Sequence, residues 1–171
     1  MSRYHDAASR LATIRERWLE EDTDAVVEVA EKLDWDLPAA VAIPQALAGA
    51  TVYRGFGVNE GDDWTTAFRH GHTPGGASHS LHRSVALSFA LGTGYLQGGA
   101  SGDRPVIVRT VVRPEDVDGG ETAIRWSGSS DTPTKELADM LYEGDTSYGE
   151  FEVVLRRLPP PRYELEWQIP E

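Results

Sequence analysis

The chain has 171 residues, 40 % of them hydrophobic and 26 % charged, which suits one domain with its own core. Its net charge of −12 disfavours non-specific binding to nucleic acid, and the absence of cysteine excludes disulfides, thiolate metal ligands and a cysteine nucleophile. The sequence shows no apolar segment of signal-peptide length and none that would span a membrane. We therefore expect a cytoplasmic protein, or one delivered into a target cell's cytoplasm without a cleaved signal peptide.

Residues 1–48 predict a helical lead-in to the main body of the domain. From Arg3 to Glu20 apolar residues recur at steps of three and four, which indicates an amphipathic helix. A second helix is expected to start at Asp24, which has the side chain of a helix cap. Pro38 and Pro44 are expected to break the chain after that helix.

Residues 49–171 alternate between strand-like and helix-like patterns. This mixture predicts an α+β fold within a single domain that covers residues 1–171. Strands are expected over residues 50–57, at the end of 72–80, and over 104–114, 122–127, 150–157 and 162–169. Helices are expected over 81–92 and 132–144, and a short helix or turn over 62–71.

Three short motifs in this second part carry polar residues suited to chemistry. They are "YRG" (Tyr53–Gly55) in a strand, "SHS" (Ser78–Ser80) between a strand and a helix, and "EFE" (Glu150–Glu152) in a later strand. If that strand is regular, Glu150 and Glu152 lie on one face of it. Each motif also has an ordinary structural interpretation: a surface arginine, a helix cap and a charged sheet edge.

In this order the three motifs resemble the arginine-serine-glutamate class of mono-ADP-ribosyltransferases, which includes many bacterial toxins and phage enzymes. The resemblance runs from about Thr51 to Leu155, and the serine motif continues into a helix with Ala86 and Phe89 at the family's spacing. It implies an ADP-ribosyltransferase-like fold, in which two small, roughly perpendicular sheets form an NAD cleft. The chain departs from the family in His79, where threonine is common, and in an insertion around residues 114–142.

The resemblance implies catalytic roles that agree with the chemistry of the residues. Cleaving the nicotinamide–ribose bond of NAD creates an oxocarbenium-like sugar, which Glu152 would stabilise. Arg54 would bind the pyrophosphate, and Ser78 would hold Glu152 in position. Gly55, Ser80 and Phe89 are further expected NAD-binding residues.

The same resemblance implies an acceptor site beside the NAD site. In this family the first glutamate of Glu-x-Glu accompanies arginine as the acceptor, so Glu150 would orient and deprotonate an arginine of a target protein. Tyr148 would contact that acceptor. The partners implied are therefore NAD, an acceptor protein and, as for toxins of this class, an immunity protein.

Several alternatives stay open at the level of sequence. The enzyme could be an NAD glycohydrolase, which transfers the ribose to water. Alternatively, the domain could be a degenerate transferase-like module that binds a partner without turnover. A nucleic-acid acceptor is disfavoured by the acidic charge but remains an alternative. A metal site is disfavoured because the pairs His70/His72 and His79/His82 have no cysteine or suitably spaced carboxylate beside them.

Overall fold

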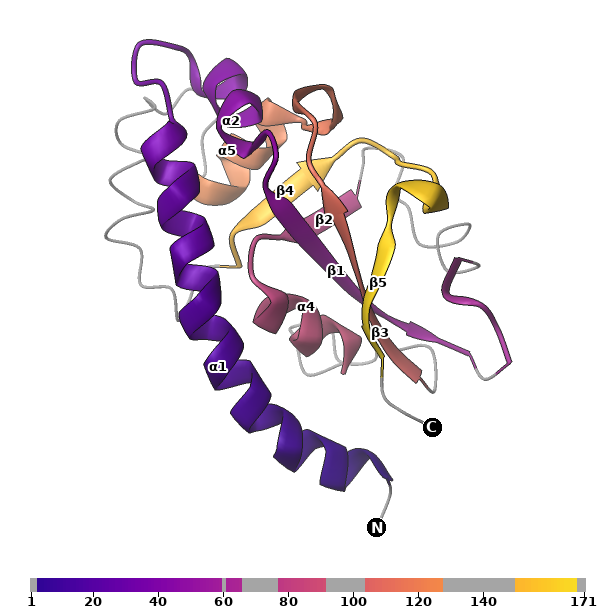
Figure 1. The fold of residues 1–171 in the computed structure, drawn as a ribbon. Helices are drawn as coiled ribbons and strands as arrows, with labels where there is room; N and C mark the ends of the chain where they lie inside the picture. The colour runs from indigo at the N-terminus through magenta and orange to yellow at the C-terminus, as the bar shows by residue number, and fades with distance from the viewer. Residues whose placement is uncertain (1–2, 60, 66–76, 92–103, 128–149, 169–171) are drawn as a thin grey trace.

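A computed structural model describes residues 3–59, 61–65, 77–91, 104–127 and 150–168, with the backbone alone for residues 3–13. The elements follow in the order α1, α2, β1, β2, α4, β3, η1, α5, β4, η2 and β5 (Figure 1). The fold is mixed α+β, as the sequence predicts. Within the described residues, no helix is long and apolar enough to cross a membrane.

The strands form one antiparallel sheet of five strands in the order β4-β2-β1-β3-β5. The long central strands β1 and β3 pair along their whole length, with Thr51 opposite Val111 and Val58 opposite Arg104. Strand β4 therefore forms one edge of the sheet. The bounds of the strands are β1 Thr51–Val58, β2 Ala77–Ser80, β3 Arg104–Val111, β4 Glu152–Leu155 and β5 Glu164–Gln168.

The junction between β1 and β2 is narrow, because these strands pair at one position, Tyr53 opposite Ser80. In Figure 1 the short pair β2 and β4 runs across the direction of β1 and β3. The expectation of two separate sheets is wrong for the described strands, since hydrogen bonds join them all into one sheet. The single paired position lets the two parts of that sheet take different directions.

The helices cover the sheet in two groups. Helix α4 (Arg83–Ala90) packs on β1 and β3, and the long helix α1 (Arg3–Lys32) lies across α4 and α2 (Figure 1). Helix α5 (Gly119–Ser127) packs between α2 (Ala39–Leu47) and β4. The 3-10 turns η1 (Pro114–Asp116) and η2 (Pro160–Arg162) precede α5 and β5.

Three predicted elements differ from the structure. Helix α1 continues through Asp24, because no glycine or proline interrupts it and Val26, Val29 and Ala30 extend its buried face. Pro44 does not break the chain as predicted, because it lies inside helix α2, where it lacks only the N–H that would bond to the carbonyl of Ala40. Gly119 packs against that carbonyl, and a Cβ at Gly119 would lie 2.2 Å from the Ala40 oxygen. The strand predicted at 122–127 is helix α5, and the predicted helix 132–144 lies outside the described residues.

Strand β3 is buried on both faces of the sheet. Val106 and Val108 belong to the larger core, which α1, α2, β1 and β4 also build. Ile107 points the other way and packs with Ala86, Leu87 and Ala90 of α4. An almost continuous apolar run is therefore needed in β3, and the sequence "PVIV" supplies it.

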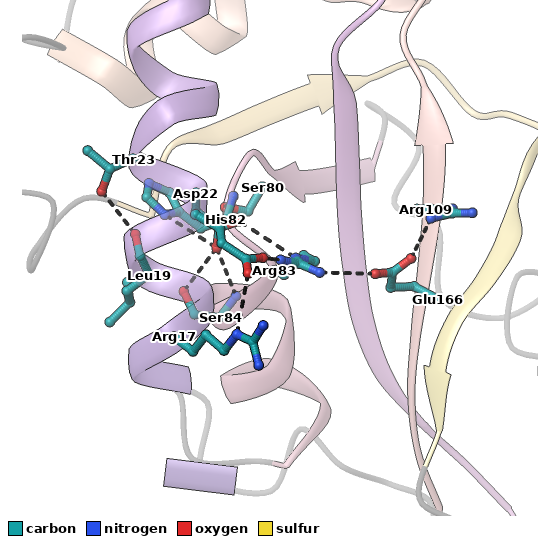
Figure 2. Close-up of polar contacts among 11 residues, drawn as sticks. Arg17, Leu19, Asp22, Thr23, Ser80, His82, Arg83, Ser84, Arg109 and Glu166 are labelled. Carbon is teal, nitrogen blue, oxygen red and sulfur yellow. Dashed lines mark hydrogen bonds and ion pairs between the residues drawn. The ribbon is translucent and has the colours of Figure 1, made fainter. Parts of the chain in front are cut away.

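A polar network ties α1 to α4 and β5 (Figure 2). Arg83, the first residue of α4, forms ion pairs with Glu21 and Asp22 of α1 and with Glu166 of β5. Its guanidinium also lies over the ring of Trp18, 4.8 Å from the centroid. These contacts fix the start of α4, which begins three residues after Ser80, the last residue of the "SHS" motif.

Candidate active site

A cavity of about 730 Å³ lies where β1, β2, β4, α4 and α5 meet. Seven of the residues predicted from the sequence line it, although they are up to about a hundred positions apart in the chain: Arg54, Gly55, Ser78, Ser80, Phe89, Glu150 and Glu152. Tyr148 lies outside the described residues. The structure thus brings the three motifs together at one site.

Ser78 and Glu152 are in direct contact in this cavity. Ser80 lies opposite Glu152 in the antiparallel pair of β2 and β4, and Ser78 lies opposite Val154, so Ser78 and Glu152 are diagonal neighbours on one face. The hydroxyl of Ser78 donates a hydrogen bond to Oε1 of Glu152. This bond orients the carboxylate, whose side chain is only 20 % exposed.

Glu150 lines the cavity, but it lies before strand β4, whereas the sequence predicted it within that strand. Strand β4 begins at Glu152, and Phe151 before it has a φ of +41°, in the left-handed region. Glu150 and Glu152 are therefore not alternate residues of one strand, as the sequence pattern suggested. Phe151 is buried against the ring of His82, with centroids 4.7 Å apart, and this packing holds the uncommon backbone conformation.

The two carboxylates of the motif nevertheless lie close enough to influence each other. Burial raises the pKa of Glu150, and the negative charge of Glu152 raises it further. Glu150 is thus a stronger base than an exposed glutamate. A carboxylate with a raised pKa is better suited to act as a general base.

Ser80 serves the structure of the site. Its hydroxyl donates to the backbone carbonyl of Glu150 at 2.5 Å and accepts from the backbone N–H of His82 at 3.0 Å. Only 4 % of the residue is exposed. Ser80 therefore connects the turn between β2 and α4 to the segment that carries Glu150, and its one proton is already donated within the protein.

Arg54 lines the same cavity as the two glutamates and comes from strand β1. Along β1, Arg54 alternates with Tyr53, which pairs with Ser80, so Arg54 belongs to the opposite face from Ser80 and Glu152. Burial lowers its pKa, and its charge is favoured by Tyr163. The hydroxyl of Tyr163 lies 2.7 Å from Nε2 of His79. Arg54 and His79 thus both line the cavity, and Tyr163 contacts His79 from outside the described lining.

Gly55 is required by packing as well as by its place in the cavity. A Cβ at this position would lie 1.7 Å from the carbonyl oxygen of Ala86 in α4. Glycine therefore lets α4 rest directly on β1. The close contact brings Phe89, one turn after Ala86, to the cavity wall.

Helix α5 supplies two cavity residues that the motifs do not include, Glu121 and Arg125, and Asp118, directly before the helix, is a third. Nε of Arg125 lies 3.6 Å from Oε2 of Glu152. The sequence predicted a strand at 122–127, and that prediction did not place Arg125 near Glu152. The spacing of Glu121 and Arg125, four residues apart, was the available signal, because it places both side chains on one face of a helix.

The cavity is acidic, with four carboxylates and two guanidinium groups among its described lining residues. The part of the chain that the structure describes contains no group of three or more residues that could hold a metal ion. His79 and His82 are both buried, and His70 and His72 lie outside the described ranges. The polar side chains of the described lining are carboxylates, hydroxyls, two arginines and His79.

We compared the whole chain with models of protein families, with curated proteins and with solved structures. None of the three comparisons finds a match.

Proposed function

We propose that the protein is an NAD-dependent mono-ADP-ribosyltransferase that cleaves the nicotinamide–ribose bond in this cavity and transfers ADP-ribose to an arginine of a target protein. The observation that carries the proposal is the hydrogen bond from Ser78 to Glu152, in a cavity that Arg54 also lines. These are the residues of the arginine, serine and glutamate motifs. Their meeting at one site is a requirement of the proposed reaction.

Glu152 would act on the sugar. As the bond from C1′ of the ribose to nicotinamide breaks, nicotinamide leaves with the bonding electrons and positive charge develops on the ribose. A carboxylate beside C1′ stabilises that charge more in the transition state than in the substrate. The bond from Ser78 holds one oxygen of Glu152, which lowers the cost of aligning it.

Glu150 would act on the acceptor. A guanidinium must lose a proton as its nitrogen attacks C1′, and the raised pKa of Glu150 makes this carboxylate a better base for that step. Asp118 and Glu121 add negative charge to the same cavity. An acidic site favours a cationic acceptor over a nucleic acid.

The finer fold assignment belongs to the same proposal. We assign the chain an ADP-ribosyltransferase-like fold because β2 and β4 run across β1 and β3 (Figure 1), and the cavity is lined by residues of both β1 and the β2–β4 pair. Residues 1–48 would be the helical lead-in and residues 49–171 the catalytic core.

The experiment that tests the function is incubation with NAD labelled in its adenylate part and a cell lysate, with and without nuclease. Label on protein is the expected result. Free ADP-ribose alone would instead identify an NAD glycohydrolase, and nuclease-sensitive label a nucleic-acid acceptor. Unchanged NAD would contradict the proposal and favour a binding module without turnover. Glu115→Gln, at an exposed carboxylate outside the cavity, is the matched control for substitutions of the cavity glutamates.

A further inference from the structure

Helix α5 is fixed to the edge strand that carries Glu152. Thr122 accepts a hydrogen bond from the backbone N–H of Val154 at 3.1 Å, and the indole of Trp126 donates to the carbonyl of Glu152 at 2.9 Å. The backbone N–H of Asp118 donates to the carbonyl of Val154 at 2.9 Å. Arg125 lies between Thr122 and Trp126 in sequence, so these bonds determine where its backbone sits relative to Glu152.

The two oxygens of Glu152 are held unequally. Ser78 donates a hydrogen bond to Oε1, whereas Arg125 lies 3.6 Å from Oε2 with its side chain 53 % exposed. An ion pair of that length and exposure is weak. A hydroxyl that reaches Glu152 would therefore replace Arg125 at Oε2 and leave the bond to Ser78 intact.

A ligand with phosphate groups needs a cation that it can reach. Of the two arginines among the described lining residues, Arg54 is the more buried, and it lies on the side of Tyr163. Arg125 also lines the cavity, is exposed, and lies near the carboxylate of Glu152. Its planar guanidinium can bind phosphate oxygens in a bidentate manner.

We propose that Arg125 is a specificity-determining residue that selects a phosphorylated ribose ligand. A ribose hydroxyl takes its place at Oε2 of Glu152, and the released guanidinium pairs with the pyrophosphate of the same ligand. This inference rests on the proposed function in taking NAD as the natural ligand. It adds a second phosphate-binding cation, on a helix that the sequence motifs do not include.

The test is calorimetric titration with two ligands, ADP-ribose and nicotinamide riboside. ADP-ribose has no nicotinamide bond to cleave, so its binding is measured without turnover, and nicotinamide riboside has the sugar without any phosphate. Arg125→Gln should raise the Kd for ADP-ribose about tenfold, and more at low than at high salt. The Kd for nicotinamide riboside should stay the same or fall. Arg125→Lys should recover part of the loss, because the charge is kept and the planar fork is not.

Arg157→Gln is the matched control, because Arg157 is exposed and outside the cavity. Equal losses for both ligands, no loss for either, or a parent protein that does not bind ADP-ribose would overturn the inference. Binding of ADP-ribose through Arg125 by a protein that leaves NAD intact would disprove the transferase and preserve the inference. If Arg125→Gln turns over NAD with an unchanged KM, the transferase proposal would stand and the role of Arg125 would be disproved.

Discussion

The hydroxyl of Ser78 donates to Oε1 of Glu152 across the antiparallel pair of β2 and β4, where the two residues are diagonal neighbours. Ser80, the residue directly opposite Glu152, turns its hydroxyl to the carbonyl of Glu150 instead. The two serines of one motif thus hold different parts of the Glu-x-Glu segment. Ser78 orients a side chain, and Ser80 fixes the backbone.

Because the two serines have different roles, their substitution should affect different quantities, the rate for Ser78 and the stability for Ser80. Ser78→Ala should lower kcat for NAD cleavage about tenfold with little change in the free energy of unfolding, because Ser78 is exposed. Ser80→Ala should lower the free energy of unfolding by about 1 to 3 kcal/mol, since it leaves the buried N–H of His82 without its acceptor. Denaturant unfolding and initial rates measured on both variants test the distinction. Equal losses of stability would show that Ser78 is structural as well.

Gly55→Ala should be strongly destabilising. The added Cβ would lie 1.7 Å from the carbonyl oxygen and 2.6 Å from the carbonyl carbon of Ala86, and these are backbone atoms of α4 that cannot rotate away. Overpacking of this kind costs about 1 to 3 kcal/mol and sometimes more. Gly120→Ala is the control, because its nearest contact would be a side-chain oxygen of Asp118 at 3.7 Å. The Tm of both variants is measured by thermal unfolding. An equal decrease of Tm in the two variants would contradict this explanation of Gly55.

The resemblance of the three motifs pointed to seven of the residues that line the cavity, but not to Asp118, Glu121 or Arg125. Runs rich in β-branched and aromatic residues also predicted strands where β1, β3 and β5 lie. What the sequence could not show is the order of strands, since pairing between β2 and β4 joins residues more than seventy positions apart. The position of Arg54 relative to the glutamates depends on the same pairing and on the narrow junction at Tyr53.

Two local sequence patterns in this chain predict a structure that the fold does not adopt. "TAIRWS" contains the β-branched and aromatic residues of a strand, but in the structure its first residue, Thr122, is buried in a helix and bonds to the edge of β4. Glu150 and Glu152 alternate as strand residues do, yet the left-handed φ of Phe151 breaks the strand before Glu152. Tertiary packing overrides local propensity in both cases.

Asp22 and His82 form a buried pair in which each group favours its neutral form. The distance between Oδ2 of Asp22 and Nδ1 of His82 is 3.7 Å, and Arg83 and Ser84 also contact the carboxylate of Asp22 (Figure 2). Burial raises the pKa of Asp22 to about 6 and lowers that of His82 to about 4. Folding therefore makes Asp22 take up a proton and His82 release one between about pH 4 and pH 6.

These two effects oppose each other in the parent protein. Asp22 contributes stability that is lost as pH rises towards about 6, and His82 contributes stability that is lost as pH falls towards about 4. Each is worth about 3 kcal/mol over its range, so their sum changes little. Asp22→Asn should leave the effect of His82, so the free energy of unfolding should rise with pH from 4 to 6.5. His82→Gln should show the opposite slope.

Urea unfolding at several pH values measures these slopes. Asp24→Asn, at an exposed carboxylate two residues from Asp22, is the control and should follow the parent protein. Identical slopes in Asp22→Asn and His82→Gln would show that the two groups do not titrate in opposite directions.

Arg54→Ala should weaken the binding of NAD by about 1.5 to 3 kcal/mol, the range of a lost charge-assisted hydrogen bond. Its burial beside Tyr163 also predicts a lower Tm, because the substitution leaves space in the cavity wall. Calorimetric titration and thermal unfolding are compared with Arg157→Ala, at an exposed position outside the cavity. A lower Tm with an unchanged Kd for NAD would show that Arg54 has a structural role and does not bind the ligand.

Glu150→Gln should separate the two steps of the proposed reaction. Glu152 remains, so some cleavage of NAD persists, but the acceptor loses the carboxylate that orients and deprotonates it. Transfer of label to protein should therefore fall much further than release of nicotinamide. Both quantities are measured side by side after circular dichroism has verified folding. Equal losses in the two assays would contradict separate roles for Glu150 and Glu152.

Release of nicotinamide from NAD by Glu152→Gln tests the central claim most directly. Glutamine keeps the shape of the side chain and its contact with Ser78, but it removes the charge that would face the oxocarbenium-like ribose. The parent protein should release nicotinamide, and Glu152→Gln should do so more slowly by a factor of about 100 or more, equivalent to about 3 kcal/mol of transition-state stabilisation. A rate equal to that of the parent and of Glu115→Gln would contradict the claim and return Glu152 to the role of a charged residue at a sheet edge.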